Sequence, residues 1–243
     1  MNHRLGIIGG GRAAWAFGST WKRIGWPIAG VATRSEPRVA QLLGAQPASI
    51  DNLARSAELI LVAVSDRAIE QVANSIPPTD AIIFHPSGAL TSLRGGFSLL
   101  PLRALQPVGE PSDLRDTLLV FEGAHRQIAQ HIARQAGARF AEIEPAQKVL
   151  YHAAAVFGSN YVAALLDIAE QLIGIEGVRD DLASLAESAI ANWRLHGGPE
   201  RFTGPASRGD AAVLERHMAA LRDRPELAQI YRLLATYILA STK

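Results

Sequence analysis

Short apolar runs are the dominant pattern in the first half of the chain. They occupy residues 5–8, 28–32, 59–64 and 81–84, with further short runs at 98–102 and 118–122. Continuous apolar runs of this kind are typical of parallel strands that are covered on both faces. Segments with helical spacing separate them, for example at residues 68–75. This alternation predicts an α/β fold, a doubly wound parallel sheet of the Rossmann type, over residues 1–144.

The pattern changes at about residue 145, where helical periodicity replaces the strand-like runs. Helices are predicted at residues 146–173, 182–196, 211–221 and 226–240. We therefore expect a second, all-helical domain over residues 145–243. The apolar stretch at 153–166 is shorter than the ~20 residues that span a bilayer, so it favours a buried core helix and no membrane partner.

A glycine motif follows the first apolar run directly. Gly9-x-Gly11-x-x-Ala14 stands between that run and a helix with apolar positions at Ala16 and Phe17. In dinucleotide-binding proteins the first glycine permits a tight turn and the second lets the backbone approach a pyrophosphate. The alternative is a purely structural glycine turn. The sequence context favours a cofactor loop formed by Gly9, Gly10, Gly11, Arg12 and Ala13.

The end of the second strand indicates which dinucleotide would bind. An acidic side chain at this place bonds the ribose 2′-hydroxyl and selects NAD. Here the chain has Thr33, Arg34 and Ser35, a guanidinium beside two hydroxyls. Such a group grips phosphate bidentately, so the sequence favours NADP, with NAD possible. Alternatively Arg34 is an exposed loop residue, and Glu36 is the acid that could reverse the assignment.

Two more loops follow predicted strands and should line the same crevice. Ligands bind beyond the carboxyl ends of parallel strands. This rule adds cofactor-binding candidates that share these two loops: Val64, Ser65, Asp66, His85, Ser87 and Gly88. Ser87 is also a candidate substrate contact. The alternative for the second loop is structural, with His85 in a turn and Ser87 as a cap.

Polar side chains form a stripe on the predicted helix at 146–173. Lys148, His152 and Ser159 are spaced by four and then seven residues, which places them on one face. Asn160 adds another polar group to the middle of this apolar helix. Lys148 or His152 could return a proton to a carbonyl oxygen or imine nitrogen that accepts hydride. Alternatively these groups are satisfied parts of the structure.

A glycine-rich loop at residues 203–210 carries one charge of each sign. Asp210 is placed to cap the following helix. Arg208 has no such routine role, and a loop arginine is a natural clamp for a substrate carboxylate. Arg208 is therefore the candidate for substrate binding.

Composition narrows the function classes. The formal net charge is +1 without a basic run, so nothing indicates nucleic acid as a partner. The chain has no cysteine, which excludes disulfides and thiolate metal sites, and its histidines show no zinc-ligand spacing. We expect no metal. The first strand begins at once, without room for a signal peptide, so a cytoplasmic location is expected.

Four motifs together resemble a known family. They are the glycine loop, residues 85–89, residues 151–161, and residues 203–205 followed by 208–210. The chain resembles the Rossmann-like reductases of domain-of-unknown-function family 2520, within the wider group of pyrroline-5-carboxylate reductase and β-hydroxyacid dehydrogenase relatives. The resemblance implies a nicotinamide-binding domain followed by a helical domain like that of 6-phosphogluconate dehydrogenase, built into homodimers with the site between domains.

One position departs from the family pattern. Where the family has a histidine before proline, this chain has Leu100 before Pro101. A contribution of that histidine to chemistry is therefore lost or relocated here. The resemblance leaves the substrate open between a ketopantoate-like 2-keto acid and a cyclic imine such as pyrroline-5-carboxylate.

Three hypotheses follow from these features. The first is an NADP-dependent oxidoreductase that reduces a carbonyl or imine of a small carboxylated substrate. The second is a sensor that binds NADP(H) without turnover. The third is a nucleotide-binding scaffold whose helical half serves dimerisation. A polar helix stripe that faces the nicotinamide favours the first of these.

Overall fold

The computed structural model describes residues 2–34 and 37–242. The chain divides into two compact units, which we call the sheet unit (residues 1–159) and the helical unit (residues 160–243). The boundary predicted after residue 144 lies just beyond the last strand. The compact units divide one helix later, so that helix α6 (Lys148–Phe157) belongs to the sheet unit.

The sheet unit is built on seven strands among the described residues, in the order β2-β1-β3-β4-β5-β6-β7. Their bounds are β1 Leu5–Ile8, β2 Ile28–Ala32, β3 Leu59–Val62, β4 Ile82–His85, β5 Phe97–Pro101, β6 Leu118–Gly123 and β7 Arg139–Glu142. The first five strands are parallel, as predicted, but β6 pairs antiparallel with β5 and β7 follows β6 in parallel. The expected Rossmann-like sheet is thus parallel with a reversed pair at one edge.

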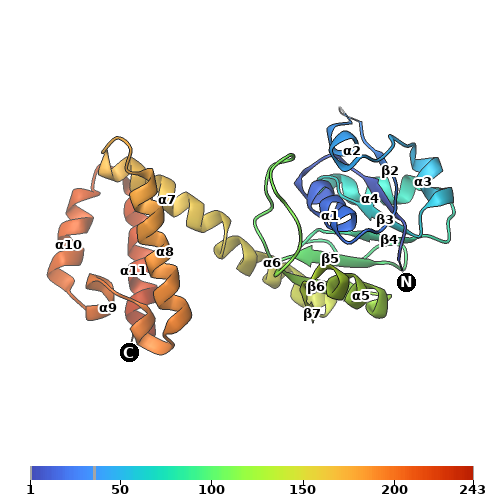
Figure 1. Cartoon of the computed structure of the whole chain (residues 1–243). Coiled ribbons are helices and arrows are strands. Elements are labelled where there is room, and N and C mark those ends of the chain that lie inside the picture. The colour runs from blue at the N-terminus through green and yellow to red at the C-terminus, as the bar shows by residue number, and fades with distance from the viewer. Residues whose placement is uncertain (1, 35–36, 243) are drawn as a thin grey trace. The chain divides into compact units, whose positions relative to one another are not determined.

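Helices cover both faces of the sheet (Figure 1). Buried side chains of α1 (Arg12–Arg23), α2 (Arg38–Leu43) and α5 (Arg126–Ala136) form one hydrophobic cluster with the strands. Those of α3 (Ile50–Ser56) and α4 (Asp66–Ser75) form a second cluster on the opposite face. Helices α3 and α5 and strand β7 were not among the elements predicted from the sequence. This layering gives the sheet the two apolar faces that the continuous runs predict.

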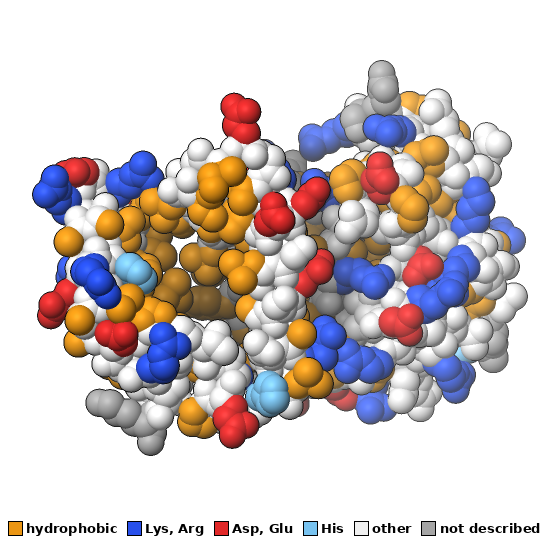
Figure 2. Space-filling view, turned by 60° about the vertical axis from the view of Figure 1, so that its left-hand side comes forward, with side chains coloured by type: hydrophobic (Ala, Val, Ile, Leu, Met, Phe, Trp, Pro, Cys, Tyr) orange, Lys and Arg blue, Asp and Glu red, His pale blue; other side chains and the backbone are white. Residues whose placement is uncertain are grey.

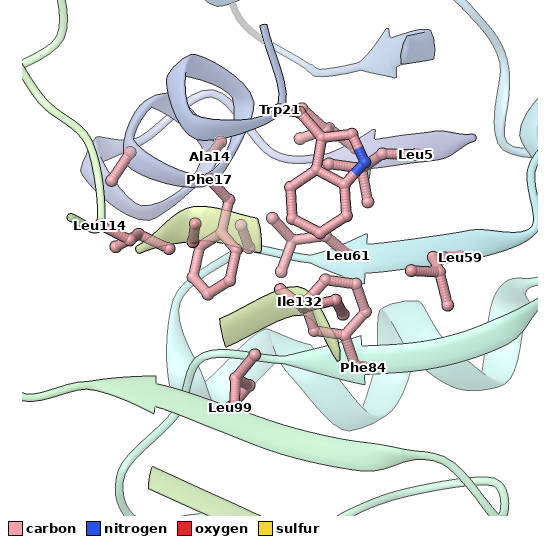
Figure 3. Packing of buried hydrophobic residues seen from close by; sticks show 14 of the residues in the cluster. Leu5, Ala14, Phe17, Trp21, Leu59, Leu61, Phe84, Leu99, Leu114 and Ile132 are labelled. Atoms are coloured by element: carbon pink, nitrogen blue, oxygen red, sulfur yellow. The ribbon is translucent and has the colours of Figure 1, made fainter. Parts of the chain in front are cut away.

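Aromatic rings fill the larger cluster (Figure 3). Trp21 and Phe17 of α1 point from the helix toward the strands and are fully buried. Phe84 of β4 stacks on Phe97 of β5, with ring centroids 4.9 Å apart. Such closely packed rings stabilise a core beyond the area that they bury. The sheet unit therefore has an extensive core of its own.

The helical unit contains α7 (Asn160–Ile173), α8 (Arg179–Leu195), α9 (Pro205–Arg208), α10 (Ala211–Ala220) and α11 (Pro225–Ser241), with a 3₁₀ turn at Gly198–Arg201. The single helix predicted at 146–173 is instead α6 and α7, separated by a turn at residues 158–159. The predicted glycine-rich loop at 203–210 includes the one-turn helix α9. Asp210 caps α10 as predicted, because its carboxylate accepts the N–H of Val213.

The expectation of a buried core helix at 153–166 is wrong for the chain by itself. None of the most apolar 18 consecutive residues within 145–173, the stretch that contains α6 and α7, is buried. By length and composition alone this stretch is apolar enough to cross a membrane. One such helix is weak evidence of a membrane span. Hydrophobic side chains also gather on the visible face of the helical unit (Figure 2). Leu185, Trp193 and Leu195 of α8 are 65–75% exposed, because no described element covers them.

Candidate functional site

A cavity of about 960 Å³ lies at the carboxyl ends of β1, β2 and β3. Its lining comes from the glycine loop, the ends of these strands, and the starts of neighbouring helices. The lining residues are Ile8, Gly9, Gly10, Gly11, Arg12, Ala13, Ala32, Thr33, Arg34, Ala48, Ser49, Ile50, Ala63, Val64, Ser65 and Val72. The volume suits a large organic ligand, since ligand sites commonly measure about 300–1,000 Å³. The cavity thus brings together most of the predicted cofactor residues.

Two glycines of the loop serve different purposes in this cavity. Gly9 has φ +130°, and a Cβ atom there would lie 2.1 Å from the carbonyl oxygen of Ala63. Only glycine fits such a position, so Gly9 is required by the fold. A Cβ atom at Gly11 would meet nothing within 4 Å. Gly11 therefore leaves open space, which is what close approach of a pyrophosphate needs.

Helix α1 offers its N-terminus to the cavity. Gly11 is the N-cap, no side chain caps the helix, and the first turn contains Arg12 and no acid. The first N–H groups of a helix have no partner within the helix and carry partial positive charge. Together with the Arg12 guanidinium they favour an anionic ligand.

The rim at the end of β2 agrees with the predicted selectivity as far as it is described. Thr33 and Arg34 line the cavity. Ser35 and Glu36 lie outside the described residues, so the proposed role of Ser35 and the alternative on Glu36 stay predictions. Sequence reasoning missed the wall formed by Ala48, Ser49 and Ile50. Helix α3 was not recognised, so no signal placed its first turn beside the strand ends.

The loop after β4 is a turn held together by its own side chains. The His85 ring nitrogen Nε2 lies 3.0 Å from the Thr91 carbonyl oxygen, and its Nδ1 accepts the Ser87 N–H at 3.3 Å. The Ser87 hydroxyl oxygen accepts the N–H groups of Ala89 and Leu90. These bonds favour the structural alternative for His85 and Ser87. Burial lowers the pKa of His85 below its ordinary value, which keeps the ring neutral.

The loop is not part of the 960 Å³ cavity. His85, Ser87, Gly88 and Asp66 do not line it, whereas Val64 and Ser65 do. Asp66 is the first residue of α4. The roles of these four residues toward a cofactor stay predictions.

Lys148 is enclosed in a polar cluster between α6 and the sheet. Its Nζ donates a hydrogen bond to the Ser98 hydroxyl and lies 3.7 Å from Oε2 of Glu122. Lys148 and Glu122 are each 2% exposed. Burial lowers the pKa of the Lys148 ammonium, and the nearby Glu122 carboxylate offsets part of this effect. Sequence reasoning singled out Lys148 but missed Glu122, because a glutamate at the end of a predicted strand gives no signal of a functional role.

His152 lies one helical turn beyond Lys148 and meets the loop after β4. A Cβ atom at Gly88 would lie 2.3 Å from its Nδ1 and 2.9 Å from Cδ2 of Leu100. Gly88 is thus needed for the imidazole to sit where it does. The Nδ1 atom of His152 and the hydroxyl of Tyr151 are buried without a protein partner in the described structure. Unsatisfied buried polar atoms of this kind are rare and mark places that a ligand can satisfy.

The remaining predicted site residues lie elsewhere on the chain. The Ser159 hydroxyl donates to the Ala155 carbonyl oxygen at 2.6 Å, and Asn160 begins α7. Arg208 ends α9 and is exposed, in the helical unit. The structure therefore gathers Lys148 and His152 within the sheet unit and leaves the proposed roles of Ser159, Asn160 and Arg208 as predictions.

Comparison with known proteins places this architecture in a family. Residues 118–238 match the model of a domain of unknown function, DUF2520. This half of the chain belongs to the DUF2520 family. The match includes Glu122, Lys148, His152 and Arg208. No curated protein matches the chain in sequence.

Solved structures resemble this protein over its whole length. A protein from Bacteroides fragilis, provisionally named an NADP oxidoreductase, has a TM-score of 0.83 and 22% identity and covers 98% of both chains. Protein TM1727 from Thermotoga maritima has a TM-score of 0.77 and 25% identity, covering 96% of this chain and 99% of that one. A reductive aminase from Aspergillus terreus, solved with NADPH and ethyl levulinate, has a TM-score of 0.67 and 16% identity, covering 98% and 93%. These likenesses establish a Rossmann-like fold with a helical C-terminal part.

Proposed function

We propose that this protein is an NADPH-dependent reductase of a carbonyl or imine group in a small carboxylated substrate. The observation that carries the proposal is the cavity in which the open Gly11 backbone, the α1 N-terminus and Arg34 meet. A backbone cradle of this kind fits a pyrophosphate, and a guanidinium at the end of β2 fits a 2′-phosphate. The names of the Bacteroides and Aspergillus proteins point to the same cofactor.

The chemistry divides between the cofactor and the protein. Bound NADPH would supply hydride to the carbon of a C=O or C=N bond. His152 or Lys148 would give a proton to the oxygen or nitrogen, so that an alcohol or amine and NADP⁺ result. His152 has a buried Nδ1 without a partner, whereas Lys148 is held by Glu122 and Ser98. This difference favours His152 as the donor.

The other predicted residues have binding roles in this proposal. Arg208 would pair with the substrate carboxylate, since a guanidinium binds carboxylates bidentately. Ser87, Ser159 and Asn160 would orient the substrate. A ketopantoate-like 2-keto acid and a cyclic imine remain the two substrate classes to test.

The first experiment measures NADPH oxidation against 2-keto acids and cyclic imines, with NADH in parallel. Arg34→Ala should weaken NADPH binding by about tenfold or more and leave NADH binding within about twofold, because a charge-assisted phosphate contact is lost. Arg38→Ala, an exposed arginine at the start of α2, is the matched control and should change neither. Equal losses for both nucleotides in Arg34→Ala would remove the selectivity argument.

A sensor that binds NADPH without turnover is the second candidate. The enclosure of Lys148 favours it, because a 2% exposed ammonium meets no substrate in this arrangement. Saturable NADPH binding, with no oxidation across both substrate classes, would support this candidate over the reductase.

A second copy of this chain is the partner that we propose for the helical unit. Ile230, Leu233, Leu234 and Tyr237 of α11 form one stripe at helical spacing and are 38–63% exposed. Exposed apolar stripes of this extent mark interaction sites. Homodimerisation would bury them, and we propose a cytoplasmic location for the assembly.

A further inference from the structure

Helix α6 is attached to the sheet in an unusual way. Its apolar residues Val149, Leu150 and Phe157 are 67–76% exposed. Lys148 is the one buried residue of α6, a helix that the structure describes completely. A helix on the surface of a sheet is normally held by its apolar face. Here the fully buried side chain is an ammonium group, and Tyr151, His152, Ala155 and Val156 are half-buried beside it.

The Glu122 carboxylate that faces this ammonium is held in place by hydrogen bonds from two serines. Ser92 donates its backbone N–H to Glu122 Oε2 at 2.8 Å and its hydroxyl to Oε1 at 3.0 Å. Ser98 donates its hydroxyl to Glu122 Oε2 at 3.1 Å and accepts from Lys148 Nζ. The carboxylate is therefore satisfied by three donors and one nearby charge. Buried ion pairs are weak sources of net stability, but removing one partner leaves an uncompensated buried charge, which is strongly unfavourable.

The group that this attachment orients is His152. It stands four residues after Lys148 on the same face of α6, and its Nδ1 fits against Gly88 without a hydrogen-bond partner. Because Lys148 is the one fully buried side chain of α6, a loss of its attachment would let the imidazole leave this place.

We propose that Glu122 is a positioning residue, which holds α6 on the sheet through Ser98 and Lys148 and so places the His152 imidazole beside Gly88. The proposal rests on the proposed function for its kinetic consequence, because there His152 gives the proton. The placement of α6 and of the His152 imidazole by Glu122 does not depend on that function. Glu122 belongs to β6 and is not one of the residues that line the cavity.

The test compares Glu122→Gln with Glu142→Gln in the full-length protein. Glu142 is an exposed carboxylate on the adjacent strand that pairs with Arg126, so it is the matched control. Glu122→Gln should speed amide hydrogen exchange in residues 149–157 by about tenfold or more and shift the ¹³C-labelled imidazole signals of His152. NADPH binding should change less than about twofold, since the cradle is intact. Glu122→Asp, which keeps the charge, should recover part of both effects.

A second variant keeps the test decisive if Glu122→Gln is unstable. Glu122→Gln with Lys148→Met removes both buried charges and should fold, because apolar replacement of a buried pair is often neutral. Fast exchange in α6 and a shifted His152 signal are expected in this double variant, because a methionine side chain cannot donate the hydrogen bond to Ser98 that orients the helix. Exchange and His152 signals equal to wild type in either folded variant would overturn the proposal.

Kinetics separate this proposal from the proposed function. If the wild type reduces a substrate, Glu122→Gln should lower kcat by about tenfold to a hundredfold with little change in KM, because a misplaced donor slows chemistry more than binding. An unchanged kcat with a displaced His152 would refute the proton-donor role and leave the positioning intact. Absence of turnover in the wild type would refute the reductase alone, because exchange and imidazole signals still decide the role of Glu122.

Discussion

The sheet unit and the helical unit differ in how far their apolar side chains are buried. The sheet unit buries its apolar side chains in two clusters, one on each face of the sheet. The described part of the helical unit buries four apolar residues, Leu182, Ala206, Leu221 and Ala228, and exposes its larger ones. Since burial of apolar surface is the main favourable contribution to folding, the first unit gains far more from its own packing than the second, and the proposed dimer would cover the surface that the second leaves exposed. The comparison indicates that substitutions in the sheet unit should affect mainly stability, whereas substitutions on the helical unit should affect mainly assembly.

The largest expected effect comes from the sheet unit. Phe84→Ala should lower the free energy of unfolding by about 3–5 kcal/mol, because it leaves a cavity between the rings of Phe17 and Phe97. Urea denaturation measures the loss, which should be independent of protein concentration. Leu42→Ala, at a residue 39% exposed on α2, is the control and should change stability far less. A comparable loss in the control would undermine the contrast between buried and exposed sites.

The second effect belongs to the helical unit. Leu233→Asp should raise the dissociation constant of the dimer by about thirtyfold or more, since a charge replaces a 63% exposed leucine at the proposed interface. Sedimentation at several protein concentrations measures this constant. Arg232→Ala lies off the apolar stripe of α11 and should leave the dimer intact. A wild-type chain that is monomeric at all concentrations would contradict the proposed partner.

The smallest expected effect is on the pH dependence of stability, and it compares a buried histidine of the sheet unit with an exposed one of the helical unit. Burial is the main effect on the pKa of His85 and lowers it below 6.5. The hydrogen bond to Thr91 and the carboxylates of Glu122 and Asp66 raise this pKa, and the charge of Lys148 lowers it. As the pH falls, His85 is therefore protonated in the unfolded chain before it is protonated in the folded protein. The contribution of neutral His85 to the free energy of unfolding is complete above about pH 6.5 and declines as the pH falls below that value. His85→Gln should flatten this decline between pH 7 and pH 5.

An exposed histidine in the helical unit provides the control for this slope. His196 has a 48% exposed side chain, and His196→Gln should leave the decline unchanged. Thermal unfolding of both variants across this pH range is the measurement. An equal change of slope in both variants would show that burial of His85 does not cause the decline.

Local patterns account for what the sequence predicted correctly. Parallel strands such as β3 are buried on both faces, so their apolar runs stand out without any knowledge of the fold. The glycine loop was recognisable because Gly9 and Gly11 act through backbone geometry close to their own positions. Strand β7 was missed because it is an edge strand of mixed polarity, partly exposed along its length.

Contacts between distant segments account for what could not be predicted. Glu122 and Lys148 come together only when α6 meets strands β5 and β6. Lys148 stood out as a polar residue on an apolar helix, but nothing in the sequence indicated that Glu122 of a distant strand would be its partner. The exposure of α7 was likewise invisible, since an exposed apolar helix can have the same apolar content as a core helix.

The central claim is that the glycine loop of the sheet unit binds NADPH, and a titration of wild type beside Gly11→Val tests it most directly. A side chain at Gly11 meets open space in the protein but would occupy the cradle. The variant should therefore melt within about 4 °C of wild type, allowing for a poorer N-cap. We predict saturable NADPH binding by wild type and a loss of about tenfold or more in the variant. Equal binding by both proteins, or no binding by wild type, would contradict the account.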